Sequence, residues 1–148
     1  MTEAPPLRRV PIEPGFFEIP DDPSAPPRLL GSRCRACGEH FFPRRVVCAR
    51  CLAPGCEDVQ LGPRGTLFTY TWVYVPFFGQ SKTGAGVGYG VGQVDLPEGP
   101  RIQAVLSGAR CEFQIGMPMQ LELEALRETD AGEVVVIHRF RPVPAEGA

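Results

Sequence analysis

The sequence contains little lysine and little histidine, and it has no long apolar run. Lys82 is the one lysine, two residues are histidine, and the formal net charge is -2. This balance gives no reason to expect tight binding to nucleic acid. No stretch approaches the roughly 18 apolar residues of a transmembrane helix, and residues 1–15 lack the apolar centre of a signal peptide. We therefore expect a cytoplasmic protein that makes no contact with a membrane.

Helix signals are also scarce, whereas glycine and proline are abundant, at 17 residues each. This composition disfavours a helical bundle and favours short strands and turns. Residues 1–27 are rich in proline and are expected to form an extended arm. The apolar cluster of this arm, Phe16, Phe17 and Ile19, is expected to dock on the body of the protein.

Strand patterns fill the C-terminal half of the chain. Turns with Gly, Pro and Asp separate five candidate strands, which are Thr66–Val75, about Val87–Leu96, Arg101–Leu106, Met119–Leu126 and Glu133–Phe140. Their spacing favours a mainly β protein with a five-stranded Greek-key barrel of the OB type, although a generic sheet or sandwich would also fit. We predict three parts, which are the extended arm (1–27), a rubredoxin-like zinc ribbon (28–60) and an OB-fold domain (61–144).

Four of the six cysteines form two Cys-x2-Cys pairs, Cys34 with Cys37 and Cys48 with Cys51. In a reducing compartment such pairs indicate metal ligands rather than disulfides. Two intervening residues let both thiolates of a pair face one ion, and residues 39–47 are expected to form a hairpin that joins the pairs. Four protein ligands leave no open position, so we predict one structural zinc ion and no catalytic metal.

Other chemistries that use the same residue types are less favoured. A redox-active Cys-x2-Cys usually opens a helix in a βαβ unit, which neither pair does, and the spacing does not match iron–sulfur patterns. The remaining two cysteines, Cys56 and Cys111, are expected to be free thiols. The sequence shows no set of nucleophile, base and acid, so we expect no catalysis by the chain alone.

The ribbon and strand motifs together resemble a known family. The motifs are Arg33-Cys34-Arg35-Ala36-Cys37-Gly38, Phe42-Pro43-Arg44, Cys48-Ala49-Arg50-Cys51, Gly65-Thr66-Leu67-Phe68-Thr69-Tyr70-Thr71, Ile115-Gly116-Met117-Pro118 and the terminal Phe140-Arg141-Pro142. This combination resembles the zinc-ribbon plus OB-fold proteins that accompany thiolase-like enzymes of acyl-CoA metabolism. The resemblance covers roughly residues 28–143.

The resemblance implies a small non-catalytic subunit of a thiolase, acyltransferase or aldolase complex that acts on a coenzyme A thioester. The thiolase-fold partner would supply the catalytic groups, and this chain would support assembly and the acyl-CoA site. A thiolase-fold dimer repeats each docking surface about its two-fold axis, so we expect a hetero-oligomer with two copies of each subunit.

Two groups of side chains are candidates for contact with acyl-CoA or with the partner. The ribbon is locally basic, with five arginines against Glu39 alone, and Arg44 and Arg45 are candidates for the CoA phosphates. A solvated or ion-paired surface is the alternative for these arginines. The second group is aromatic and suits an interface, and its members are Trp72, Tyr74, Phe77 and Phe78.

Glycine occupies every second position from Gly84 to Gly92. In a strand these residues would all lie on one face, where they would leave room for another backbone or a ligand. The alternative is a flexible loop over Phe78–Gly90, of which only the end forms a strand.

Two other functions remain open. A single-stranded nucleic-acid-binding protein would also use an OB fold and a zinc ribbon, but six acidic residues within 112–133 disfavour it. A free-standing rubredoxin-like electron carrier is disfavoured because the sequence shows no redox partner motif.

Overall fold

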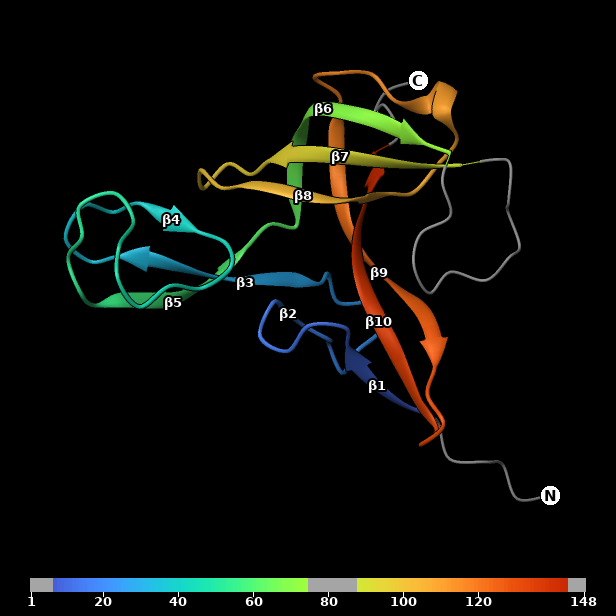
Figure 1. Ribbon diagram of the computed structural model, residues 1–148, viewed down its shortest axis with the longest axis horizontal. Coiled ribbons are helices and arrows are strands. Elements are labelled where there is room, and N and C mark those ends of the chain that lie inside the picture. The colour runs from blue at the N-terminus through green and yellow to red at the C-terminus, as the bar shows by residue number, and fades with distance from the viewer. Residues whose placement is uncertain (1–6, 75–87, 144–148) are drawn as a thin grey trace.

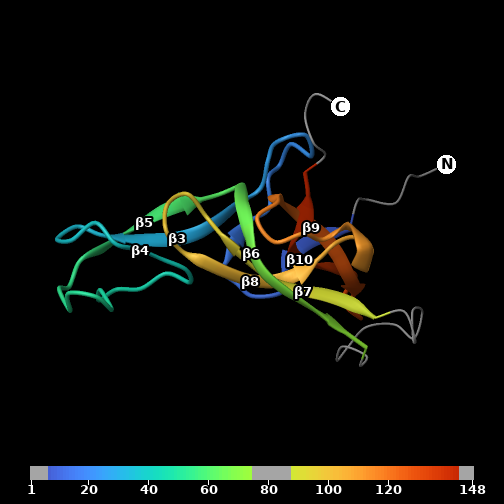
Figure 2. The same cartoon turned by 90° about the horizontal axis from the view of Figure 1, so that it is seen from above.

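The computed structural model describes residues 7–74 and 88–143, which form two β-sheets (Figure 1). The one helical element in these ranges is a 3-10 turn at Arg110–Glu112, so the predicted mainly β architecture is confirmed. No helix in the same ranges is long and apolar enough to cross a membrane. Both views show the smaller sheet projecting to one side of the larger one (Figures 1 and 2).

The smaller sheet is the ribbon, and it consists of β2 (Phe17–Glu18), β3 (Arg28–Cys34), β4 (His40–Phe41) and β5 (Cys56–Leu61). β3 is central because it pairs antiparallel with each of the other three strands. Ser32 of β3 is fully buried, and its hydroxyl oxygen accepts a hydrogen bond from the backbone N–H of Arg45 (2.9 Å). This bond holds the chain that follows β4 against the centre of the sheet.

Five of the six strands of the larger sheet form a closed barrel, and they are β6 (Arg64–Val73), β7 (Tyr89–Asp95), β8 (Arg101–Leu106), β9 (Pro118–Glu128) and β10 (Glu133–Pro142). Neighbours pair in the order β10-β8-β7-β6-β9, and β9 pairs with β10 to close the ring. Of these five pairs, β8–β10 is parallel and the others are antiparallel. The predicted OB-type barrel is confirmed, and each strand begins and ends within two residues of its predicted bounds.

The described part of the proline-rich N-terminal segment contributes one short strand to each sheet, and turns separate these strands from each other and from β3. β1 (Arg8–Pro11) pairs in parallel with β10, which places Arg8 opposite Glu133. β2 pairs with β3 of the ribbon. Phe17 is buried in the core, and Phe16 and Ile19 pack against it, so the predicted docking of this apolar cluster is confirmed.

One hydrophobic core runs through both sheets. From the ribbon side it takes Phe17, Leu29 and Leu61, and from the barrel it takes mainly Leu67, Val94, Ile102, Leu106, Met119, Leu121 and Phe140. Burial of these side chains is the main favourable contribution to folding.

The glycines of β7 face this core. A Cβ atom on Gly92 would lie 2.8 Å from a methyl group of Leu106, and one on Gly90 would lie 3.2 Å from the ring of Phe113. Barrel side chains, rather than another backbone or a ligand, therefore occupy the space beside these two glycines. Gly84 and Gly86 lie outside the described residues.

The link between ribbon and barrel is short, and hydrogen bonds hold both backbone groups of Gly62. β5 ends at Leu61 and β6 begins at Arg64. The N–H of Gly62 donates to Oε1 of Glu98 (3.2 Å), and the guanidinium of Arg28 donates to the Gly62 carbonyl. Glu98 lies in the turn after β7, so the barrel fixes the point from which the ribbon projects.

Candidate metal centre

The first pair of cysteines forms a tight turn at the end of β3. The backbone N–H of Cys37 points at the sulfur of Cys34 (3.5 Å), and the N–H of Gly38 donates to the Cys34 carbonyl (2.9 Å). Gly38 has a φ of 80°, which glycine adopts without the steric penalty of a Cβ atom.

The second pair repeats this geometry with one difference. The N–H groups of Arg50 and Cys51 point at the sulfur of Cys48 (3.3 and 3.4 Å), and the N–H of Leu52 donates to the Cys48 carbonyl (3.0 Å). Leu52 therefore occupies the position that Gly38 has in the first turn. It has a φ of 63°, and its side chain is 76% exposed.

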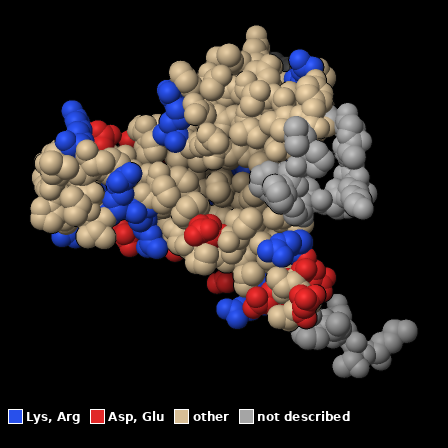
Figure 3. All heavy atoms as spheres, in the orientation of Figure 1, with Lys and Arg blue, Asp and Glu red and all other residues tan. Residues whose placement is uncertain are grey.

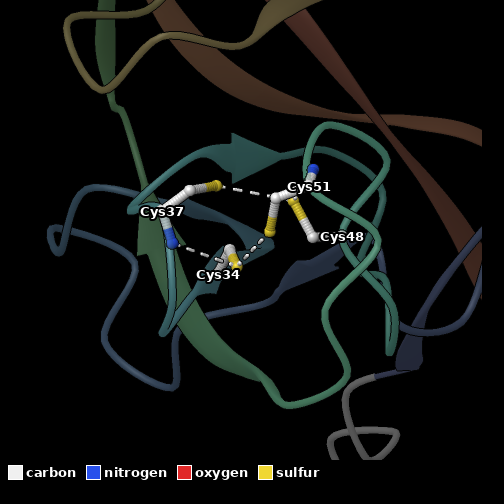
Figure 4. Close-up of side chains that lie close together, drawn as sticks. All are labelled: Cys34, Cys37, Cys48 and Cys51. Carbon is white, nitrogen blue, oxygen red and sulfur yellow. Dashed lines mark hydrogen bonds between the residues drawn. The ribbon is translucent and has the colours of Figure 1, made fainter.

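The two turns bring the four sulfur atoms together (Figure 4). All four lie within 4.8 Å of one another. The sulfurs of Cys34 and Cys51 are 3.7 Å apart, and those of Cys37 and Cys48 are 3.6 Å apart. A tetrahedron with Zn–S bonds of about 2.3 Å has edges of about 3.8 Å. The donor set and its spacing therefore fit one four-coordinate zinc ion.

Backbone N–H groups also favour the charged form that a metal needs. The pKa of Cys34 is lowered to about 6, chiefly because the N–H of Cys37 points at its sulfur. Burial opposes ionisation of Cys48, yet the N–H groups of Cys51 and Arg50 bring its pKa below the ordinary value. Zinc binds thiolates, so these two buried sulfurs are prepared for it.

The other two cysteines are free thiols, as predicted. Cys111 is exposed in the 3-10 turn. Cys56 begins β5 directly opposite Cys34. Burial raises the pKa of Cys56, and the charges of Cys34 and Cys48 add to this shift. The spacing of Cys56, five residues after Cys51, places it within reach of the metal centre, but its pairing with Cys34 does not follow from the spacing.

The prediction of a basic ribbon opposed by Glu39 alone is wrong, because β5 supplies two further carboxylates. Glu57 lies 3.2 Å from Arg33 and 3.6 Å from Arg35, Asp58 lies 3.1 Å from Arg44, and Glu39 lies 3.2 Å from Arg50. Within the described residues, Arg45 is the member of the five that forms no ion pair. Its guanidinium lies over the ring of Phe41, 5.6 Å from the centroid.

The aromatic candidates occupy different environments. Trp72 is partly buried and packs on Phe113, with ring centroids 6.3 Å apart. Tyr74 is exposed, and its hydroxyl oxygen accepts a hydrogen bond from Arg110 (2.6 Å). Phe77 and Phe78 lie outside the described residues, so their contact with a partner or with acyl-CoA stays a prediction.

A four-thiolate ribbon joined to an OB-type barrel defines a zinc-ribbon and OB-fold protein. Residues 25–57 match the ChsH2 rubredoxin-like zinc ribbon domain, and residues 58–124 match the ChsH2 C-terminal OB-fold domain. The chain is 34% identical over 132 residues to the benzoylsuccinyl-CoA thiolase subunit BbsA of Thauera aromatica, across 89% of this chain and 88% of that protein. The chain therefore belongs to the ChsH2 family, and the family predicted from the sequence motifs is confirmed.

Two further similarities broaden the comparison. The chain is 29% identical over 118 residues to a DUF35 domain-containing scaffold protein of Methanocaldococcus jannaschii, across 78% of this chain and 82% of that protein. Among solved structures, a chain of the Ltp2-ChsH2(DUF35) aldolase matches with a TM-score of 0.59 and 27% identity. That match covers 78% of this chain and 84% of the other.

Proposed function

We propose that this chain is a non-catalytic, zinc-binding subunit of a thiolase-like enzyme complex that acts on a coenzyme A thioester. The observation that carries the proposal is the likeness to a benzoylsuccinyl-CoA thiolase subunit along nearly the whole of both chains. The likeness to a chain of an aldolase and to a scaffold protein supports the same role. The chain would support assembly of the complex and its acyl-CoA site, while the thiolase-fold partner performs the chemistry.

The metal centre supports a structural rather than a catalytic role for this subunit. Zinc bound by Cys34, Cys37, Cys48 and Cys51 would have no open position for substrate or water. Its chemistry there would be to hold the two turns of the ribbon together. The ribbon would then present a fixed surface to the partner.

The outer face of the barrel is the surface that we propose for docking. The inward direction of Gly90, Gly92 and Val94 sends Val91 and Gln93 outward, because side chains alternate along a strand. A shallow pocket of about 240 Å³ lies on this face, lined mainly by threonine, glutamine and valine side chains of β6, β7 and β8. Figure 3 shows that this surface is almost free of charge, whereas charged side chains gather on the ribbon and at the far end of β9 and β10.

The docking face lies on strands that lead to the aromatic candidates. Depletion of charge and enrichment of aromatic side chains are typical of the centre of an interface. We therefore propose that the partner covers the outer face and reaches Trp72 and Tyr74 at the end of β6, together with Phe77 and Phe78. Arg45 is the ribbon arginine best suited to a CoA phosphate, because an ion pair already engages each of the other four.

Co-expression with a thiolase-fold partner, followed by size-exclusion chromatography with light scattering, tests the proposal. We expect one complex with two copies of each subunit, and no turnover of acyl-CoA by the small subunit alone. Val91→Arg places a charge at the centre of the docking face and should abolish co-elution. Ala125→Arg, at an exposed position of β9, is the matched control and should leave assembly unchanged.

Two results would overturn the proposal. One is turnover by the isolated chain in a preparation free of thiolase-fold protein. The other is separate elution at micromolar concentrations together with tight, salt-sensitive binding of single-stranded oligonucleotides, which would favour the nucleic-acid function.

A further inference from the structure

The metal centre has a fifth sulfur beside it, which belongs to Cys56. This residue is the first of β5, and its cross-strand partner in the ribbon sheet is Cys34, the last residue of β3. Side chains of directly opposed residues project from the same face of a sheet. The Cys56 side chain therefore lies next to the most deeply buried part of the metal centre.

The hydrogen bonds of the two residues show which kind of pair they form. The N–H of Cys34 donates to the carbonyl of Glu39 (2.8 Å), and the N–H of Cys56 donates to the carbonyl of Val46 (3.2 Å). Both N–H groups thus point away from the opposite strand, so the two cysteines form a non-hydrogen-bonded pair. In such antiparallel pairs the Cα atoms are about 4.5 Å apart and the side chains are closest.

This separation is compatible with a disulfide bond. Disulfides join Cα atoms about 4.4 to 6.8 Å apart, so the two sulfurs can bond without a change in strand register. Cys56 is also half-buried, whereas Cys34 is fully buried. Solvent therefore reaches the pair from the Cys56 side.

We propose that Cys34 and Cys56 form an oxidation site that controls occupancy of the metal centre, with hydrogen peroxide as the class of oxidant. One sulfur of the pair cleaves the O–O bond and becomes a sulfenic acid, and the other sulfur then displaces the hydroxyl group. In total, the Cys34 thiolate, the Cys56 thiol and one peroxide give the disulfide, one water and one hydroxide. The two sulfurs lose two electrons to the peroxide, and the Cys56 proton leaves in the water.

The disulfide removes one of the four metal ligands. With the Cys34 sulfur in the S–S bond, three thiolates remain, and a structural zinc site needs four protein ligands to stay closed. Reduction of the disulfide restores the fourth thiolate. The pair thereby links the folded state of the ribbon to oxidising conditions, and this inference does not depend on the proposed enzyme partner.

The test uses the full-length, zinc-loaded chain treated with a small excess of hydrogen peroxide. A chromogenic chelator reports zinc release, and mass spectrometry of the alkylated protein locates the disulfide. Trypsin cuts after Arg50 and chymotrypsin after Leu52, so a double digest separates Cys51 from Cys56. We expect zinc release with a linked Cys34–Cys56 peptide, and recovery of zinc binding after reduction with dithiothreitol and addition of zinc.

Cys56→Ser and Cys111→Ser are matched variants, because each removes one free thiol that is not a metal ligand. Both should contain one zinc before oxidation, which shows that each is folded. Cys111→Ser should release zinc at the wild-type rate, and Cys56→Ser several-fold more slowly. Equal release by Cys56→Ser and the wild type would overturn the proposal, as would disulfides confined to the four metal ligands. If Cys56→Ser lacks zinc, Cys56→Ala takes its place in the measurement of zinc release. A peptide map of the oxidised wild type without the Cys34–Cys56 link would then still overturn the proposal.

Discussion

The ribbon and the barrel are stabilised by different means. The barrel closes on itself and encloses most of the buried apolar side chains. The ribbon contributes few to the same core, and two of its own fully buried side chains are the metal ligands Cys34 and Cys48. A module with so little apolar burial depends on its metal for folding free energy. One chain can therefore join a metal-dependent unit, the ribbon, to a metal-independent unit, the barrel, through a link of two residues.

The surfaces of the ribbon and the barrel also differ, in the charge that they carry. The ribbon carries ion pairs between exposed side chains, such as Arg50 with Glu39 and Arg44 with Asp58, and pairs of this kind contribute about 1 kcal/mol or less. The outer face of β6, β7 and β8 carries almost no charge (Figure 3). The ribbon surface is thus suited to solvent, and the barrel face to burial under a partner.

The largest difference between ribbon and barrel is expected after removal of one metal ligand. Cys37→Ser and Cys48→Ser should each lose zinc and unfold the ribbon, because structural sites of this type contribute about 10 kcal/mol or more of apparent binding free energy. The strands of the barrel should persist. Elemental analysis and amide NMR spectra of the purified variants measure both effects, with Cys111→Ser as the control. Absence of zinc from the wild type, or iron with the absorption of a cluster, would contradict the assignment.

Loss of Glu98 should destabilise the protein at the link between the ribbon and the barrel. Glu98→Ala leaves the N–H of Gly62 without its acceptor and should lower the free energy of unfolding by about 1–2 kcal/mol. Glu98→Gln retains an oxygen for this bond and should lose less. Urea denaturation at constant zinc content measures the difference. Equal stability of the alanine variant and the wild type would show that the barrel does not hold the ribbon through this contact.

A pH dependence should arise where the arm, the ribbon and the barrel meet. His138 of β10 lies among the rings of Phe16, Phe17 and Phe42, with centroids 6.5, 5.6 and 6.1 Å away. Burial lowers the pKa of His138 below 6.5. As the pH falls from 6.5, unfolded chains therefore take up a proton that folded chains do not, and the free energy of unfolding decreases.

His138→Leu removes this titration. The melting temperature of the variant should fall less between pH 7.5 and pH 5.5 than that of the wild type. Comparison of the two proteins in the same buffers cancels the effect of zinc loss at low pH, because both retain the four thiolates. An identical pH dependence would mean that burial does not lower the pKa of His138 in the folded protein.

The smallest effect is expected from exchanging the residues that follow the two Cys-x2-Cys pairs. Leu52 adopts the left-handed conformation that Gly38 adopts in the other turn, and this conformation costs a residue with a Cβ atom about 1–2 kcal/mol. Leu52→Gly should relieve part of that cost, whereas Gly38→Leu should introduce it. Thermal denaturation of the zinc-loaded variants would reveal the opposite signs. A destabilised Leu52→Gly would show that the exposed leucine makes a compensating contact.

The sequence predicted the features that local patterns specify. Paired cysteines predicted the metal ligands, and alternating β-branched and aromatic residues predicted the barrel strands. The missed features depend on contacts between distant segments. Pairing of Arg8–Pro11 with β10 joins opposite ends of the chain, and the ion pairs of Glu57 and Asp58 depend on the register of β3 with β5. The inward direction of Gly92 likewise follows from barrel closure, which no local pattern specifies.

The position of β10 after every other described strand has a consequence for the order of folding during synthesis. The four strands of the ribbon and all four cysteine ligands precede residue 62, whereas the barrel closes only when β10 pairs with both β8 and β9. Pairing between residues far apart in sequence is slow, and chains emerge from the ribosome N-terminal end first. A nascent chain can therefore load its metal well before the barrel exists. Among the described strands, β1 is the first to be made, and its partner β10 is the last.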